Sequence, residues 1–177
     1  MSEILTFTGK MFDPIHPDPQ LIDIRDIAHA LSMLARANGH FPTFHSVGQH
    51  SLECFEEARM RGWSKRLQLA CLLHDGSEAY LSDVTRPVKA VMPLYLEYEA
   101  PLQEAIWNKW LGEPLTQEER RQVFSVDDAL LYHEFYTHTG MRLADTQPQI
   151  VSRPSFAFVP FDQVETAFLE AFSSVRE

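Results

Sequence analysis

The sequence has no long apolar run. It contains only two cysteines, and its positive charges are fewer than its negative charges. Its hydrophobic stretches are far shorter than the roughly 18 residues that indicate a membrane-spanning helix, so we expect no membrane partner. The opening residues, MSEILTFTGK, lack a basic segment followed by an apolar core, which predicts no secretory signal. Cys54 and Cys71 lie in apolar helical patterns and form no CxxC pair. We therefore expect buried, reduced thiols in a cytoplasmic protein.

The charge balance is acidic. The chain has 25 Asp and Glu against 15 Lys and Arg, a net charge of −10. Proteins that bind nucleic-acid polymers need a basic surface, so we expect no such partner. A small phosphate ester remains a reasonable ligand, because a local group of metal ion, Arg and Lys can override the field of the whole molecule.

The remaining composition indicates one all-α domain over residues 1–177. Hydrophobic residues make up 45% of the chain, enough for a compact core. Apolar residues recur at helical spacing and strand signals are few, which predicts a compact helical bundle. We expect a short extended segment near each terminus, the later one at Ser155–Phe158. Capping residues and glycines place the helices at about 23–36, 47–61, 64–73, 97–111, 116–138 and from about 162 onward. The predicted caps are Asp23, Ser46 and Ser64, together with a capping box formed by Thr116 and Glu119.

A histidine and a His-Asp pair stand out from the other polar residues. His74 and Asp75 follow an apolar helical stripe, so both side chains are expected at the edge of the core. His50 is in the first turn of the preceding helix, from which it can face the same point. Imidazole and carboxylate are ligands for a borderline divalent cation. Taken alone these residues are only a weak signal, because adjacent His-Asp pairs are common by chance.

Three sequence blocks resemble the HD-domain phosphohydrolases. They are HSVGQHS at 45–51, LLHDGSEAYLSDVTRPVK at 72–89 and SVDDALLYHE at 125–134, in the order that the family has them. Within that family the chain most resembles the nucleotide-hydrolysing subgroup, which includes bacterial 5'-deoxynucleotidases and deoxynucleoside-triphosphate hydrolases. The stretch at 24–40 resembles the N-terminal helix and loop of that subgroup. The resemblance implies a domain core at about 24–139 and hydrolysis of small nucleotides or other phosphate esters.

The resemblance also implies a metal site. The pattern H…HD…D corresponds to His50, His74, Asp75 and either Asp127 or Asp128. We prefer Asp127, because it follows an apolar residue and shares a helix face with Leu130, Leu131 and Glu134. Family members with two metals need further histidines between the second and third blocks, and this chain has none there. One divalent cation is therefore expected, whether Co, Mn, Mg, Ni, Fe or Zn.

Two acidic residues after the His-Asp pair are implied as catalytic. Glu78 lies about one turn after Asp75, and the resemblance makes it the residue that transfers a proton or positions water. Asp83 matches an acidic residue that the nucleotidases place near the scissile phosphate or the sugar. The alternative for Asp83 is a turn cap before Pro87.

Basic residues near these blocks are expected to bind phosphate. The resemblance assigns this role to Arg36 and Lys89, and it leaves the role of Arg86 open. His40 and His45 flank the loop before the first block, where they either contact phosphate or base or serve only the structure. The other histidines singled out, His16, His29 and His138, are interpreted as structural.

The leading hypothesis is a metal-dependent nucleotide hydrolase that acts on mono- or triphosphates. The alternative is a non-catalytic domain that binds metal or nucleotide, or acts as a sensor. A homo-oligomer is a further expectation, because the stretch 95–110 is apolar enough to form either a dimer surface or part of the core. Its apolar residues are Leu96, Ile106, Trp107 and Trp110.

Overall fold

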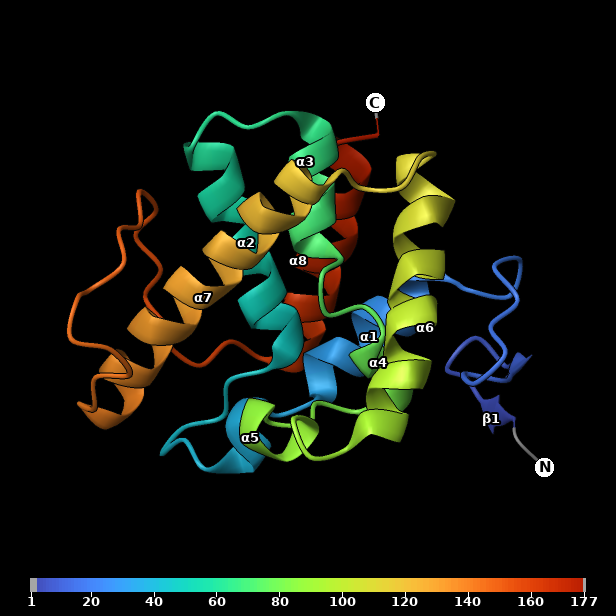
Figure 1. The fold of residues 1–177 in the computed structure, drawn as a ribbon, viewed down its shortest axis with the longest axis horizontal. Helices are drawn as coiled ribbons and strands as arrows, with labels where there is room; N and C mark the ends of the chain where they lie inside the picture. Colours follow the sequence, from blue (N-terminus) through green and yellow to red (C-terminus); the bar gives the residue numbers. More distant parts are fainter. Residues whose placement is uncertain (1–2, 177) are drawn as a thin grey trace.

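The computed structural model describes residues 3–176, which fold mainly into α-helices (Figure 1). The all-α prediction is therefore confirmed. Within the described range the only sheet is a small hairpin, in which Ile4 pairs antiparallel with Phe12. The elements are β1 Ile4–Leu5, β2 Met11–Phe12, α1 Ile24–Met33, a 3-10 turn η1 Arg36–Gly39, α2 Val47–Met60, α3 Lys65–Leu72, α4 Glu78–Leu81, α5 Arg86–Lys89, α6 Pro93–Leu111, α7 Gln117–Thr139 and α8 Phe161–Ser174.

Four helices begin at the caps that the sequence predicts. The side chain of Asp23 accepts a hydrogen bond from the Arg25 amide at the start of α1. Ser46 and Ser64 do the same for α2 and α3. At α7, Thr116 and Glu119 form the expected capping box. Each cap satisfies an amide that the first helical turn leaves without a partner, which explains why these starts are readable from sequence.

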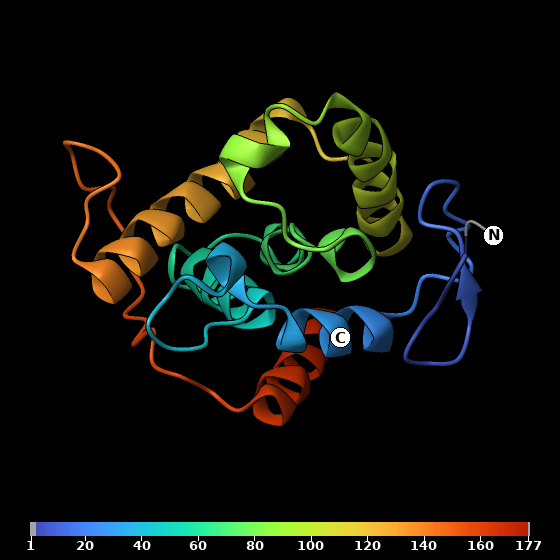
Figure 2. The same ribbon diagram turned by 90° about the horizontal axis from the view of Figure 1, so that it is seen from below.

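Helices α2 and α3 lie in the middle of the bundle. Helix α2 packs against α1, α3, α7 and α8, and α3 packs against α6 and α7 as well, as the view from below shows (Figure 2). Gly48 allows α2 to approach α1 and α8 closely. A Cβ at this position would lie 3.1 Å from the Leu31 carbonyl carbon, the Ser32 nitrogen and a methyl group of Val164. The first turn of α2, which carries His50, is therefore fixed against two neighbouring helices.

The structure corrects three expectations about boundaries. Helix α6 begins at Pro93 instead of about Glu97, because proline suits the first turn of a helix. The loop expected after the His-Asp pair contains the short helices α4 and α5. The extended segment expected at Ser155–Phe158 is wrong: these residues form no strand, and Phe156 has a φ of 51°, which interrupts an extended run.

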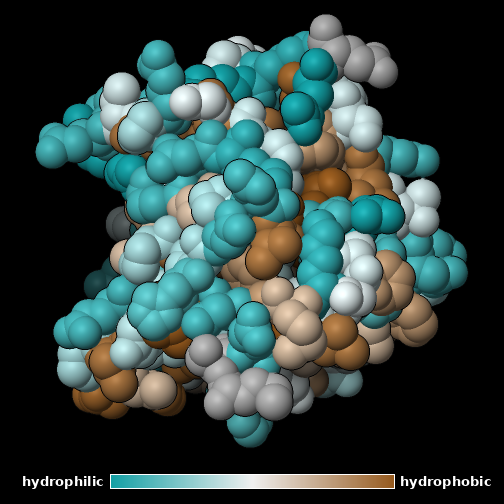
Figure 3. Space-filling model, turned by 90° about the vertical axis from the view of Figure 1, so that its right-hand side faces the viewer, coloured by the Kyte–Doolittle hydropathy of each residue, from teal (hydrophilic) through white to brown (hydrophobic). Residues whose placement is uncertain are grey.

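The apolar stretch of α6 contributes mainly to the core. Ile106 and Trp107 are buried, whereas Leu96 is exposed. On the side of the molecule shown in Figure 3, hydrophobic residues form separate patches between hydrophilic ones. The homo-oligomer stays a prediction. None of the helices in residues 3–176 combines the length and the apolar character that crossing a membrane would require.

Candidate metal centre

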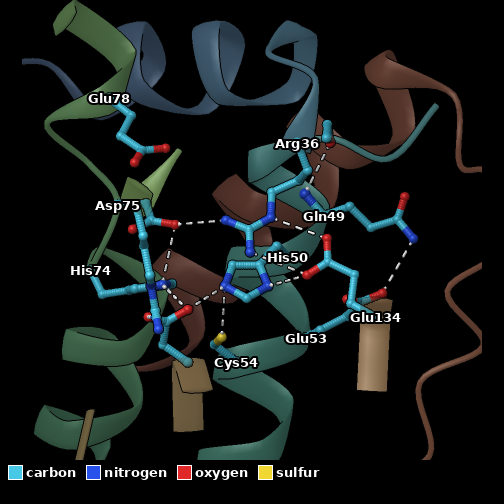
Figure 4. A network of polar contacts seen from close by, with 12 residues as sticks. Arg36, Gln49, His50, Glu53, Cys54, His74, Asp75, Glu78 and Glu134 are labelled. Carbon is cyan, nitrogen blue, oxygen red and sulfur yellow. Dashed lines mark hydrogen bonds and ion pairs between the residues drawn. The ribbon is translucent and has the colours of Figure 1, made fainter. Parts of the chain in front are cut away.

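His50 lies in the centre of a buried polar cluster (Figure 4). It is fully buried, and its Nε2 atom lies 3.1 Å from Oδ1 of Asp127 on α7. Its Nδ1 atom lies 3.3 Å from Oε2 of Glu134, two turns further along α7. One ring nitrogen therefore faces a predicted ligand, and the other faces a carboxylate that can fix the orientation of the ring.

His74 and Asp75 lie in the turn that follows α3 rather than inside a helix. The Nδ1 atom of His74 lies 2.8 Å from the carbonyl oxygen of Cys71. Since a carbonyl only accepts, Nδ1 carries the proton and Nε2 faces the cluster. That Nε2 is buried without a hydrogen-bond partner, 3.2 Å from Oδ2 of Asp75 and 3.7 Å from Oδ1 of Asp127. A cation between these atoms would satisfy it.

The two adjacent aspartates on α7 point in different directions. The side chain of Asp127 is 13% exposed and reaches His50 and His74, whereas that of Asp128 is 61% exposed. Arg86 joins them from the solvent side, donating to Oδ2 of Asp127 at 2.7 Å and to Oδ1 of Asp128 at 2.6 Å. The structure therefore brings Asp127, and not Asp128, to the histidines.

The electrostatics of the cluster favour a bound positive charge. Burial acts to lower the pKa of His74, but Asp75 and Asp127 outweigh it and raise the pKa well above its usual value. The pKa of His50 is also raised, because contacts with Asp127 and Glu134 outweigh burial and Arg36. Burial acts to raise the pKa of Asp75, but His74 brings it down to about 2. The same carboxylates that attract a proton to the histidines would attract a divalent cation in its place.

The spacing of the candidate ligand atoms fits such a cation. Bonds of 2.0–2.2 Å at angles between 90° and the tetrahedral value put nitrogen and oxygen ligands about 3.0–3.4 Å apart, and the smaller angles leave room for further ligands. The separations here are 3.1 Å from His50 to Asp127, and 3.2 and 3.7 Å from His74 to the two carboxylates. Imidazole and carboxylate together suit Zn, Fe, Co or Mn. These three contacts are therefore compatible with a shared cation in chemistry and in distance.

Arg36 lies inside the cluster, in contact with carboxylates. It donates from Nε and Nη2 to the two oxygens of Glu134 at 3.1 and 3.2 Å, and Nη1 lies 3.5 Å from Asp75. The residues after it, Ala37 and Asn38, have φ values of 52° and 51°. Left-handed conformations cost energy in residues other than glycine, so the surrounding packing holds this turn in place.

Glu78 begins α4 and faces Asp75 (Figure 4). It is buried, and its Oε2 atom has no hydrogen-bond partner. Burial, together with the charges of Asp75 and Asp83, raises the pKa of Glu78 well above its usual value. Lys89 lies 3.6 Å from Oε1 of Glu78 and donates to Glu99 at 2.6 Å. These surroundings favour the protonated form of the carboxyl group, which is the form that can donate a proton.

The remaining candidate residues, Asp83, His40 and His45, differ in burial and in their contacts with the cluster. Asp83 is half-buried near the cluster, and burial raises its pKa. His40 is exposed and contacts none of the cluster residues by hydrogen bond or ion pair. His45 is fully buried, with Nε2 3.3 Å from Glu53 and 3.5 Å from Glu134. His45 thus belongs to the carboxylate network behind His50 and does not line an open loop.

Two residues of the cluster were not singled out as functional from sequence. The sequence pattern predicts for Glu134 only that it shares a helix face with Asp127, yet Glu134 contacts Arg36, His50 and His45. Cys54 was expected to be a buried apolar residue. It is buried, and burial raises the pKa of its thiol well above the usual value, but Sγ lies 3.5 Å from Nε2 of His50. Its spacing of four residues from His50 on one helix was the available signal.

Comparison with known proteins finds relatives but no stated activity. No family model matches the chain. The uncharacterized protein YfdR of Escherichia coli is 37% identical over 112 residues, which cover 62% of this chain and 59% of the relative. An uncharacterized protein of Rhodobacter capsulatus is 40% identical over 105 residues, 56% of this chain and 53% of the relative. The chain spans a little more than half the length of these curated relatives.

Proposed function

We propose that the protein is a metal-dependent hydrolase of small phosphate esters, with nucleoside or deoxynucleoside mono- or triphosphates as its substrates. The observation that carries the proposal is the group of His50, His74, Asp75 and Asp127, in which both histidines are buried and Nε2 of His74 has no hydrogen-bond partner. The resemblance of the three sequence blocks to the HD-domain phosphohydrolases supports the same conclusion.

One divalent cation held by these four residues would supply Lewis acidity, which activates water and neutralises phosphoryl oxygens. Glu134 lies at ion-pair distance from His50, with Oε2 3.3 Å from Nδ1, and its charge can orient the imidazole. The imidazole of His74 is kept in orientation by the Cys71 carbonyl oxygen. Ligands oriented in this way lose little freedom when the cation binds.

Glu78 acts as the proton donor in this mechanism. Burial and the charges of Asp75 and Asp83 raise its pKa, which favours the protonated form of the carboxyl group. As water attacks phosphorus and the ester P–O bond breaks, Glu78 gives its proton to the departing oxygen, and the proton that the attacking water loses restores the carboxyl group afterwards. The resulting carboxylate is stabilised by Lys89, whose Nζ lies 3.6 Å away. Arg36 and Lys89 contribute the positive charge that a phosphate group needs, and Asp83 contributes to positioning the phosphate or sugar.

The test is a panel of metals against a panel of nucleotides. Metal-free protein is supplied with Co, Mn, Mg, Ni, Fe or Zn and mixed with nucleoside mono- and triphosphates. We expect at least one pair to release phosphate or tripolyphosphate, and the product identifies the bond that is cut. Absence of release with every pair would overturn the proposal and leave the alternative, a binding or sensory domain without activity. The expected cytoplasmic location stays a prediction.

A further inference from the structure

Cys54 lies one helical turn after His50 on α2, so both side chains leave the same face of the helix. Sγ is 3.5 Å from Nε2 of His50, the nitrogen that faces Asp127 (Figure 4). The thiol is 1% exposed, and no other hydrogen-bond partner for it occurs among residues 3–176. It therefore points into the cluster and not into a separate apolar site.

The distance suits two ligands of one cation. A metal–sulfur bond of 2.3 Å and a metal–nitrogen bond of 2.0–2.1 Å at a tetrahedral angle put the two atoms about 3.6 Å apart. His74 provides an independent observation. Its unpartnered, buried Nε2 faces the same point, and ligand atoms of His50, Cys54 and His74 all lie within 4.8 Å of one another. In the described part of the chain this is the one group of three metal-binding side chains that meets such a limit.

An ordinary S–H hydrogen bond to His50 is the competing explanation. That bond requires the lone pair on Nε2, which is the same lone pair that a cation would use. The S–H hydrogen bond to Nε2 and a cation bound to Nε2 therefore exclude each other. Once a cation occupies Nε2, the thiol has lost its only acceptor among the described residues and lies within reach of the cation. Loss of its proton to solvent then converts it into a thiolate ligand.

We propose that Cys54 is a ligand of the cation at this centre, which thereby binds the thiophilic ions Zn²⁺, Co²⁺ and Fe²⁺ in preference to Mg²⁺ and Mn²⁺. Sulfur is a soft donor, whereas Mg²⁺ and Mn²⁺ favour oxygen ligands. The inference rests on the proposed function only in taking the cluster to be a metal centre. It does not depend on the substrate or on turnover.

The test is the absorption spectrum of the full-length, metal-free protein titrated with Co²⁺. A thiolate ligand adds a sulfur-to-metal charge-transfer band in the near ultraviolet to the visible bands of the bound ion. Cys54→Ser should remove the charge-transfer band and keep the visible bands. Cys71→Ser is the matched control, because Cys71 is also a free, buried thiol but lies outside the group of three. It should keep both bands.

Metal affinities give a second measurement. Cys54→Ser and Cys54→Ala, each checked for retained helicity by circular dichroism, should weaken Zn²⁺ binding by about 10-fold or more and change Mn²⁺ binding by much less. Bound Co²⁺ without a charge-transfer band would overturn the role of Cys54 and leave the metal centre intact. A band that survives Cys54→Ser would also overturn it. Failure of any divalent cation to bind would remove both the inference and the proposed function.

Discussion

Asp127 and Asp128 are adjacent on α7 and both contact Arg86, but only Asp127 reaches the histidines. This makes them a matched pair for mutation. Asp127→Asn should lower metal affinity and turnover by about 100-fold or more, because a ligand is lost from a buried site. Asp128→Asn removes an exposed charge and should change both by less than about 3-fold. Metal content by mass spectrometry and phosphate release distinguish the two, and the reverse result would exclude Asp127 as a ligand.

A substitution at Glu78 should lower turnover without affecting metal binding. Glu78→Gln keeps the shape of the side chain but removes the acidic carboxyl group, whose raised pKa favours the proton-donating form. We expect turnover to fall by about 10²- to 10⁴-fold with metal binding unchanged. His74→Ala, in contrast, should lose the metal and the activity together. Full activity in the glutamine variant would show that another group supplies the proton.

At the scale of single residues, the resemblance of the three sequence blocks predicted which side chains meet, whereas the residue types and spacing alone were only a weak signal. His50, His74, Asp75 and Asp127 lie within hydrogen-bond or ion-pair distance of one another in a connected set. The same patterns could not reveal Glu134 as a shared partner. Its contacts depend on the way α7 packs against α2 and the turn at Arg36, which no local pattern encodes.

Among the secondary-structure elements, helix starts were the most predictable feature. Asp23, Ser46, Ser64 and Thr116 each satisfy an amide within a few residues, so the information is local. The irregular segment before α8 was not predictable, because distant side chains determine its path. Gln49, for instance, donates to the carbonyl oxygen of Ala157 at 2.9 Å.

Glu57 on α2 also holds the segment before α8, through hydrogen bonds from Val151 and Ser152. Loss of its carboxylate should therefore destabilise the fold. Glu57 is fully buried and accepts hydrogen bonds from the Val151 amide, from the amide and hydroxyl of Ser152, and from Arg61. Glu57→Gln should lower the free energy of unfolding by about 1–3 kcal/mol at neutral pH. The neighbouring Glu56→Gln, an exposed residue paired with Arg59, should change it by less than about 0.5 kcal/mol.

The effect of Glu57 should depend on pH in a defined direction. Although burial acts to raise its pKa, the hydrogen bonds from Ser152, Val151 and Arg61 lower it below the ordinary 4.5. A carboxylate with a lowered pKa in the folded state stabilises the fold above its unfolded pKa and loses this effect as the pH falls through the folded value. Urea unfolding should therefore show the wild-type advantage over Glu57→Gln narrowing below about pH 4. A difference constant with pH would contradict this account.

At the scale of the whole molecule, the cluster joins four separate parts of the chain: η1, α2, the turn after α3, and α7. A cation bound among them should therefore stabilise the entire fold. At a concentration 100 times the dissociation constant it adds about 2.7 kcal/mol. For a chain of this size that raises Tm by about 5–10 °C. Differential scanning calorimetry should show this rise with Co²⁺ or Zn²⁺ and none in His74→Ala; an equal rise in that variant would place the cation elsewhere.

The central claim is that one cation at this cluster enables hydrolysis of a nucleotide phosphate ester. Its most direct test is a titration of metal-free protein with the most active cation, with phosphate or tripolyphosphate release measured at each ratio. The account predicts activity that rises linearly and saturates at one cation per chain, with no release from Asp127→Asn at the same ratios. Saturation at two cations per chain, or no release at any ratio, would contradict it.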